Sequence, residues 1–142
     1  MQSLGMESLP LRFERSSSNA LKIAQFLENH SAVTSVNFPG LESSPYHHIS
    51  LKQFESIPTS VLSFNLKDRE RCFTFLNRLE FISIATNLMD NRTLILHPAS
   101  SIYSEYGTER RAAMQVPDTL IRISVGIEDI EDLLTDLTNA LS

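Results

Sequence analysis

The segment 120–128 contains the residue with the clearest chemical potential in the chain, Arg122. Ile121, Ile123 and Val125 alternate with the residues between them, which is the period-two pattern of a strand with one buried face. Arg122 therefore belongs to the opposite face, on a stiff support. A guanidinium in that place can form a bidentate pair with a carboxylate or phosphate, or it can simply be solvated. The residues alone favour the solvated arginine.

Other residue types that support catalysis or metal binding are sparse. The single cysteine, Cys72, excludes an internal disulfide, and its place on the apolar stripe of a helix predicts a packing residue rather than a nucleophile. His47 and His48 are adjacent and have no partner at ligand spacing, so we interpret them as solvated. The four glycines form neither a Walker loop nor a dinucleotide motif. None of the three lysines has neighbours typical of a Schiff-base site: Lys22, Lys52 and Lys67.

The length and composition of the chain are typical of one globular domain. Its 142 residues are 42% hydrophobic and 20% charged, enough to bury a core. The net charge of −5 disfavours nucleic acid and anionic membranes as partners, because binding them requires a basic face. No apolar run approaches the roughly 18 residues of a membrane span, and no signal peptide is recognisable. We therefore expect a cytoplasmic protein with no nucleic-acid or membrane partner.

Hydrophobic periodicity predicts helices alternating with short strands. The expected helices span residues 9–30, 45–54, 68–79, 108–114 and 127–141. The expected strands span residues 32–38, 60–66, 81–85 and 93–97, together with the segment around Arg122. This order of elements predicts an α+β sandwich, in which the first, middle and last helices cover one side of a single sheet.

Polar clusters in the first and last helices allow more than one interpretation. Residues 16–19, Ser-Ser-Ser-Asn, could cap a helix that begins there or lie at polar, exposed positions of one longer helix; local propensity favours the cap. Glu128, Asp129, Glu131 and Asp132 crowd the start of the last helix, where the helix dipole favours negative charge. We interpret these acids as capping and solvated residues rather than as a catalytic pair.

Segments along most of the chain resemble one enzyme family. Residues 87–94, 97–100 and 120–129 resemble the C-terminal domain of the trans-sulfuration enzymes, the pyridoxal-phosphate-dependent enzymes of cysteine and methionine metabolism. Residues 9–15, 19–20 and 36–41 also fit this resemblance. Within the family, the loop that contains Asp90 and Arg92 looks most like that of the O-acetylhomoserine sulfhydrylases.

The resemblance implies a fold and a domain organisation. The fold is the small C-terminal domain of fold-type I enzymes, a mostly antiparallel sheet of four to five strands packed on helices. Residues 1–142 would form this single, substrate-side domain, beginning with one long linker helix from about residue 6 to 30. The N-terminal cofactor domain, which holds the Schiff-base lysine in the family, would be absent. We therefore expect the isolated chain to be inactive and to bind no pyridoxal phosphate.

The resemblance also implies substrate-binding roles for three residues. The arginine that matches Arg122 binds the α-carboxylate of the amino-acid substrate in the family. Asn87 matches a position that helps to hold the same carboxylate, and Thr86 matches a position that tunes side-chain specificity. The parent enzyme would be a transferase or lyase acting on a homoserine ester, cystathionine or methionine. We expect no catalytic residue, cofactor ligand or metal ligand in this domain.

Further expectations concern the loop, the partners and an alternative function. Met89 stands where the family usually has glycine, so the loop backbone is expected to differ there. The first helix would face the enzyme's own cofactor domain through four apolar residues, Leu4, Leu9, Leu11 and Phe13. The parent enzyme would be a homotetramer. The alternative function is a stand-alone, non-catalytic interaction domain derived from the same family.

Overall fold

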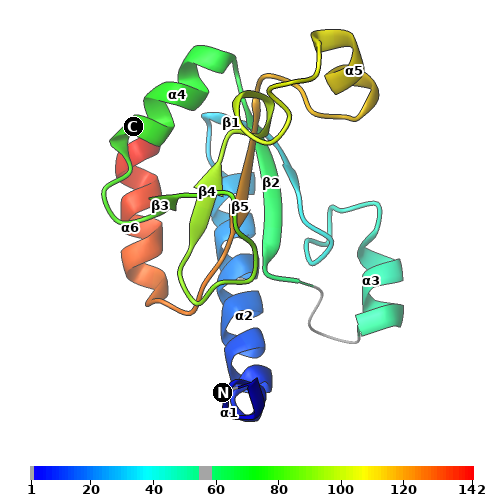
Figure 1. Cartoon of the computed structure of the whole chain (residues 1–142), viewed down its shortest axis with the longest axis vertical. Coiled ribbons are helices and arrows are strands. Elements are labelled where there is room, and N and C mark those ends of the chain that lie inside the picture. The colour runs from blue at the N-terminus through cyan, green and yellow to red at the C-terminus, as the bar shows by residue number, and fades with distance from the viewer. Residues whose placement is uncertain (1, 55–58) are drawn as a thin grey trace.

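A five-stranded sheet forms the centre of the computed structural model, which describes residues 2–54 and 59–142 (Figure 1). Its spatial order is β1-β2-β5-β4-β3, and β3 pairs with β4 in parallel while the other neighbours are antiparallel. The predicted α+β fold with a mostly antiparallel sheet is therefore confirmed. The strands are β1 (Val33–Asn37), β2 (Val61–Leu66), β3 (Ser83–Ile84), β4 (Leu94–Leu96) and β5 (Leu120–Ser124).

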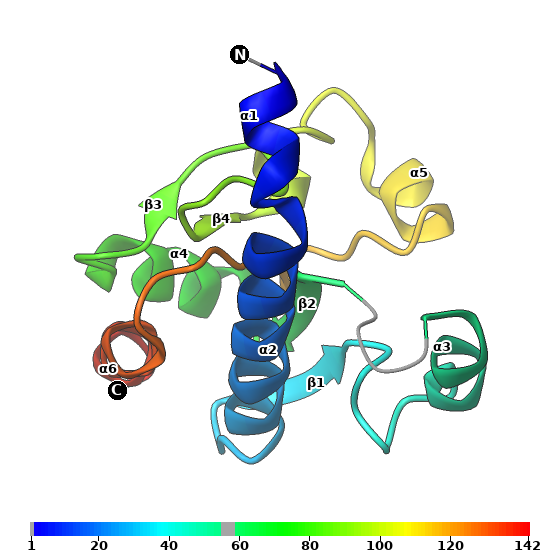
Figure 2. The ribbon, with the colours of Figure 1, turned by 90° about the horizontal axis from the view of Figure 1, so that it is seen from below.

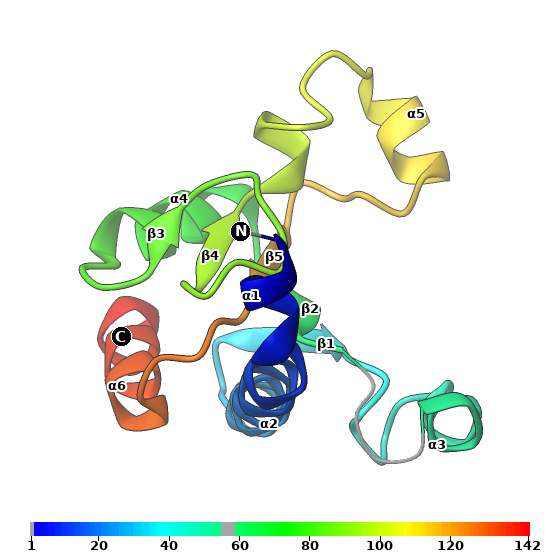
Figure 3. The same cartoon turned by 60° about the horizontal axis from the view of Figure 1, so that its bottom comes forward.

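Three helices cover one face of this sheet, as the sequence predicts. Figure 2 shows the positions of α2, α4 and α6. These helices contribute to one buried cluster together with the inward residues of β2 and β5. The helices α3 and α5 lie apart from these three (Figure 3). The helices are α1 (Gln2–Glu7), α2 (Leu9–Glu28), α3 (His47–Phe54), α4 (Arg69–Arg78), α5 (Thr108–Ala113) and α6 (Ile130–Leu141), with a 3-10 turn, η1, at Pro98–Ser100. None of the described helices combines the length and the apolar character needed to cross a membrane.

The register between β2 and β5 orients Arg122. Phe64 of β2 pairs with Ile121 of β5, and both side chains are fully buried against the helices. Ser63 pairs with Arg122, so these two side chains share the opposite face of the sheet. Burial of each large apolar side chain in this way contributes about 1.5–3 kcal/mol to the stability of the fold. A shift of the strand register by one residue would turn these side chains to the other face and would therefore be costly.

The long helix continues through Ser16–Asn19, so the cap expected there is wrong. α2 begins after Ser8, and Ser16, Ser17 and Asn19 are buried rather than exposed. The side-chain amide of Asn19 donates to the carbonyl oxygens of Gly126 (3.2 Å) and Glu128 (3.0 Å). A helix that packs on the end of β5 needs polar side chains there, because the chain has left the sheet and its carbonyl groups lack ladder partners.

Several other elements are shorter than expected, including α6 and β3. α6 begins at Ile130, and Asp129 caps it by accepting from the backbone N–H of Glu131 at 2.9 Å. β3 has two residues rather than the five expected over 81–85. The buried carboxylate of Asp136 accepts the backbone N–H groups of residues 80, 81 and 82 at 2.8–3.2 Å. These amides therefore bind a side chain of α6 instead of extending the sheet.

Cys72 is a packing residue, and we expect it to be chemically inert in the folded chain. It is fully buried, its Sγ contacts the carbonyl oxygen of Thr119 at 3.3 Å, and burial raises the pKa of the thiol to about 11. Relative to the ordinary value of 9.0, this lowers the thiolate fraction at pH 8 roughly 100-fold. Labelling with a thiol reagent should be at least about 100-fold slower in buffer than in denaturant. Equal rates would contradict the burial.

Gln115 occupies a backbone conformation that favours glycine, and its replacement should stabilise the chain. Gln115 has a φ of 58° and follows the end of α5. The N–H of Gln115 donates to the carbonyl oxygen of Ala112 (3.0 Å), and the N–H of Val116 donates to that of Arg111 (2.9 Å). This pair of hydrogen bonds is the Schellman motif. Gln115→Gly should raise the free energy of unfolding by about 0.5–1 kcal/mol, because it removes the strain of a left-handed side chain. Urea unfolding measures this, with Gln115→Ala as the unchanged control; a less stable glycine variant would contradict it.

Candidate functional site

Arg122 lies on the face of the sheet that the three core helices leave open. Its neighbours across the strands are Ser63 of β2 and Leu96 of β4. A cleft of about 280 Å³ opens beside it, between β2, β5 and the segment that follows η1. The cleft is lined by Asn37, Pro39, Val61, Leu62, Ser63, Pro98, Ile102, Tyr103, Val116, Leu120 and Arg122. The apolar walls lower the local dielectric around one cationic group.

The guanidinium of Arg122 has spare hydrogen-bonding capacity. Its Nη2 donates to the backbone carbonyl oxygen of Thr86 at 3.2 Å. Within residues 2–54 and 59–142, no acidic side chain forms an ion pair with it. Partial burial lowers the pKa of Arg122, and the nearby Tyr103 opposes this effect, but a guanidinium stays protonated in proteins. The guanidinium can therefore bind an external carboxylate at the cleft.

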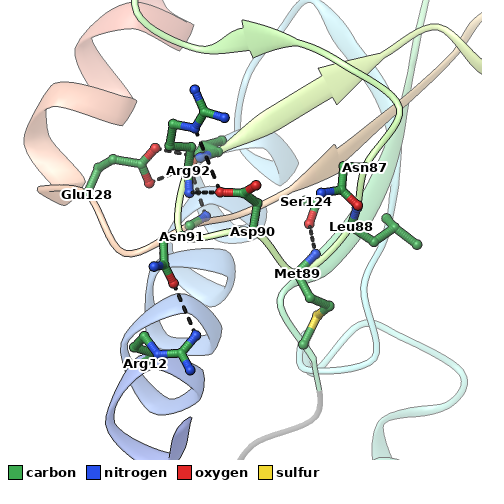
Figure 4. Close-up of polar contacts among 11 residues, drawn as sticks. Arg12, Asn87, Leu88, Met89, Asp90, Asn91, Arg92, Ser124 and Glu128 are labelled. Carbon is green, nitrogen blue, oxygen red and sulfur yellow. Dashed lines mark hydrogen bonds and ion pairs between the residues drawn. The ribbon is translucent and has the colours of Figure 1, made fainter. Parts of the chain in front are cut away.

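The structure brings Thr86 to Arg122 and leaves the side chain of Asn87 in its own loop. Thr86 contacts Arg122 through its backbone, and its side chain is exposed. Asn87 is exposed as well, and its Oδ1 accepts from the N–H of Leu88 at 2.9 Å (Figure 4). Of the two residues expected beside Arg122, Thr86 thus contacts it through the backbone, whereas the side-chain amide of Asn87 is turned to the loop backbone.

The loop backbone at Met89 is left-handed. Met89 has φ of 57°, in the region that glycine adopts most easily. Its N–H donates to Ser124 at 2.9 Å, and its Sδ accepts from the hydroxyl of Ser60 at 3.1 Å. A methionine at this position therefore keeps a conformation suited to glycine, and contacts with Ser124 and Ser60 hold it there.

Glu128 is not the solvated acid that the sequence suggested. Its carboxylate accepts from both the backbone N–H and the hydroxyl of Thr93, at the start of β4. Sequence reasoning assigned it to the start of the last helix, but α6 begins two residues later and the chain first passes beside β4. Sequence reasoning also missed Ser63 as a cleft residue. The alternation of apolar and polar residues in the segment 60–66, with Leu62 and Phe64 facing inward, already placed Ser63 on the same face of the sheet as Arg122.

The fold and this cleft define a small α+β domain with a candidate anion-binding site. A model of the family described as Cys/Met metabolism PLP-dependent enzyme matches residues 1–142. The chain belongs to this family.

Proteins of several activities in the family are similar to the chain. The L-methionine gamma-lyase of Treponema denticola is 44% identical over 138 residues, which are 96% of this chain and 34% of that protein. The O-acetyl-L-homoserine sulfhydrylase 1 of Thermus thermophilus is 42% identical over 98% of this chain and 33% of that protein. The chain thus spans about a third of the length of the curated relatives it matches.

A solved structure supports the same relationship. It is that of a Campylobacter jejuni protein described as an O-acetylhomoserine (thiol)-lyase, which contains N'-pyridoxyl-lysine-5'-monophosphate. It matches 97% of this chain and 33% of its own chain, with a TM-score of 0.91 and 35% identity. The α+β fold of this chain is therefore that of a domain within a pyridoxal-phosphate-dependent enzyme.

The residues of this chain do not fit a complete pyridoxal phosphate site. A Schiff base requires a lysine, and the three lysines are exposed and lie outside the Arg122 cleft: Lys22, Lys52 and Lys67. Within the described ranges, no group of three or more His, Cys, Asp or Glu side chains could hold a metal ion. The chemistry that these residues can perform is recognition of an anionic group by Arg122.

Proposed function

We propose that this chain is the substrate-side domain of a pyridoxal-phosphate-dependent enzyme of cysteine and methionine metabolism, in which Arg122 binds the α-carboxylate of the amino acid. The observation that carries the proposal is the half-buried guanidinium at the cleft, with one hydrogen bond to Thr86 and no acidic partner among the described residues. A planar guanidinium binds a carboxylate through two parallel hydrogen bonds, so one rigid strand residue sets both the position and the rotation of the substrate.

Asn87 and Thr86 have secondary roles in this proposal. Asn87 follows the carbonyl group that Arg122 contacts, so a turn of its side chain would direct an amide at the second carboxylate oxygen. Thr86 exposes its side chain beside the same contact, where it can meet the substrate beyond the carboxylate. The substrate class is a homoserine ester, cystathionine or methionine, and the loop residues Asp90 and Arg92 favour a sulfhydrylase.

The cofactor domain is the partner that we propose for the first helices. Large apolar side chains are exposed along α1 and the start of α2, whereas Phe13 is half-buried. Exposed apolar residues clustered at one end of a domain are typical of a surface that contacts another domain. The exposed residues are Leu4, Met6, Leu9 and Leu11. We propose a homotetrameric parent enzyme in the cytoplasm, with pyridoxal phosphate held by the cofactor domain.

A chimera tests the role of Arg122. This chain would replace the matching third of the L-methionine gamma-lyase of Treponema denticola, with which it shares 44% identity. Arg122→Ala should lower kcat/KM for methionine by about 100-fold, mainly through KM, because a charge-assisted bidentate pair of about 3 kcal/mol is lost. Arg122→Lys should lower it by about tenfold, because lysine keeps the charge but not the planar fork.

The matched control for this experiment is Arg71→Ala. Arg71 is exposed on α4, on the other side of the sheet, so its removal should leave kcat/KM unchanged. Wild-type kinetics in the Arg122→Ala chimera would refute the proposal. Equal losses of activity in the Arg122→Ala and Arg71→Ala chimeras would also count against a specific role for Arg122.

The isolated chain should form no specific adduct with pyridoxal phosphate. Its three lysines are exposed, and a solvated lysine reacts with aldehydes weakly and reversibly. Titration of the chain with pyridoxal phosphate should give no saturable absorbance band near those of an internal aldimine. A saturable band that survives dialysis and disappears in one lysine-to-arginine variant would contradict this expectation.

A further inference from the structure

The loop between β3 and β4 lies along β5 and the segment that follows it (Figure 4). Its contacts follow the same direction along both segments, apart from the one between Thr93 and Gly126, so the loop and the 122–128 segment form a set of paired attachments. The attachments join Thr86 to Arg122, Met89 to Ser124, Asn91 to Ile127, and Thr93 to Gly126 and Glu128. The segment that presents Arg122 therefore also holds the loop that contacts it.

Glu128 makes a two-point, charge-assisted attachment. Its carboxylate accepts the backbone N–H of Thr93 and, at 2.8 Å, the hydroxyl of Thr93. The hydroxyl oxygen of Thr93 in turn accepts the N–H of Gly126 at 2.9 Å. Thr93 is almost completely buried, so these charge-assisted hydrogen bonds lie in a low dielectric and are stronger than neutral ones in water.

Gly126 lets the loop approach this closely. A Cβ at this position would overlap the carbonyl oxygen of Asn91 and would lie 2.6 Å from the carbonyl carbon of Arg92. The φ of Gly126 is not positive, so the requirement for glycine is one of space and not of backbone conformation. The loop backbone is therefore in direct contact with the chain after β5.

The other restraints on the loop are fewer: the N–H of Ala85 donates to the carbonyl oxygen of Ile95 at 3.1 Å just before it, and the sulfur of Met89, a weak acceptor, accepts from the hydroxyl of Ser60. β3, which precedes it, has only two residues, and the Arg12–Asn91 and Asp90–Arg92 contacts are in solvent-exposed surroundings. Exposed polar contacts of this kind contribute little. Thr86 and Asn87 are themselves exposed. The position of this pair relative to Arg122 thus depends mainly on the attachments to the 122–128 segment.

We propose that Glu128 is a positioning residue, which fixes the loop through Thr93 so that Thr86 and Asn87 are held against Arg122. This inference rests on the proposed function, since it assigns Glu128 to the same carboxylate-binding group. Glu128 does not touch the substrate in this scheme; it acts through the loop, with Gly126 providing the space and Ser124 a second attachment at Met89.

The first test uses the 142-residue chain and does not depend on enzymatic activity. Glu128→Ala should speed amide exchange at Met89 and Thr93 by about tenfold or more, the factor expected from the loss of one charge-assisted hydrogen bond, and should shift the side-chain NMR signal of Arg122. Glu128→Gln should give intermediate changes, because its carbonyl oxygen can still accept from the Thr93 N–H whereas its amide nitrogen cannot accept from the hydroxyl.

Asp129→Ala is the matched control. Asp129 is the next residue, and it caps α6 without contacting the loop, so its removal should lower the melting temperature but leave the Arg122 signal unchanged. If Glu128→Ala lowers the melting temperature in the same way and moves neither the loop amides nor the Arg122 signal, Glu128 is only a structural residue and the inference is overturned.

The second test uses the chimera and separates this inference from the proposed function. Glu128→Ala should raise KM for methionine by about tenfold with a smaller change in kcat, while Asp129→Ala leaves KM unchanged. An effect of Arg122→Ala without any effect of Glu128→Ala would refute the positioning role and leave the proposed function intact. A different result would refute the proposed function instead: Glu128→Ala speeds amide exchange in the loop of the 142-residue chain, but the Arg122→Ala and Glu128→Ala chimeras both keep the wild-type KM.

Discussion

The central constraint on this domain is the burial of Ile121 and Ile123 in a strand that is hydrogen-bonded on both sides. β5 lies between β2 and β4, and its inward residues pack under three helices. Because side chains alternate along a strand, Arg122 must then lie on the face of the sheet opposite the helices. An arginine on a loop would lose conformational freedom with each carboxylate bound, whereas this one is oriented by the core before any ligand arrives. The strand β5 thus contributes to the core through Ile121 and Ile123 and to the cleft through Leu120 and Arg122.

The loop that contacts Arg122 is held differently. β3 is only two residues long, and the amides that would extend it donate to Asp136 of α6. The loop that follows has few ladder hydrogen bonds, so side chains and exposed carbonyl groups replace them. Asn19 makes a similar contribution at the end of β5, where it donates to two carbonyl oxygens. The buried residues Asn19 and Asp136 therefore act where a strand ends or begins and the chain must still be held in place.

This difference explains how much the sequence could predict. Strong periodicity placed β5, its inward residues and the open face of Arg122, because a half-buried strand has one consistent pattern. The cap expected within residues 16–19 was wrong, since the burial of Asn19 depends on carbonyl groups about 107 residues later in the chain. The contacts of Glu128 and Asp136 could not be predicted either, because an acid before a helix or within it looks the same in the sequence whether it meets solvent or a distant backbone amide. The resemblance named Arg122, Asn87 and Thr86, and no local pattern could have done so for the last two.

The contact between Arg122 and Thr86 bears on how specificity could vary within the family. Arg122 uses the backbone carbonyl oxygen of Thr86, so any residue at position 86 can make this hydrogen bond. The side chain at that position is exposed and free to differ without disturbing the arginine. Lyases and sulfhydrylases are similar to this chain at 44% and 42% identity, which fits a domain whose main task, in the proposed function, is common to all of them. Every amino-acid substrate has an α-carboxylate, so its recognition cannot distinguish one reaction from another. In the proposed function, discrimination then comes from groups that meet the substrate beyond the carboxylate, and position 86 could change for that purpose while Arg122 stays constant.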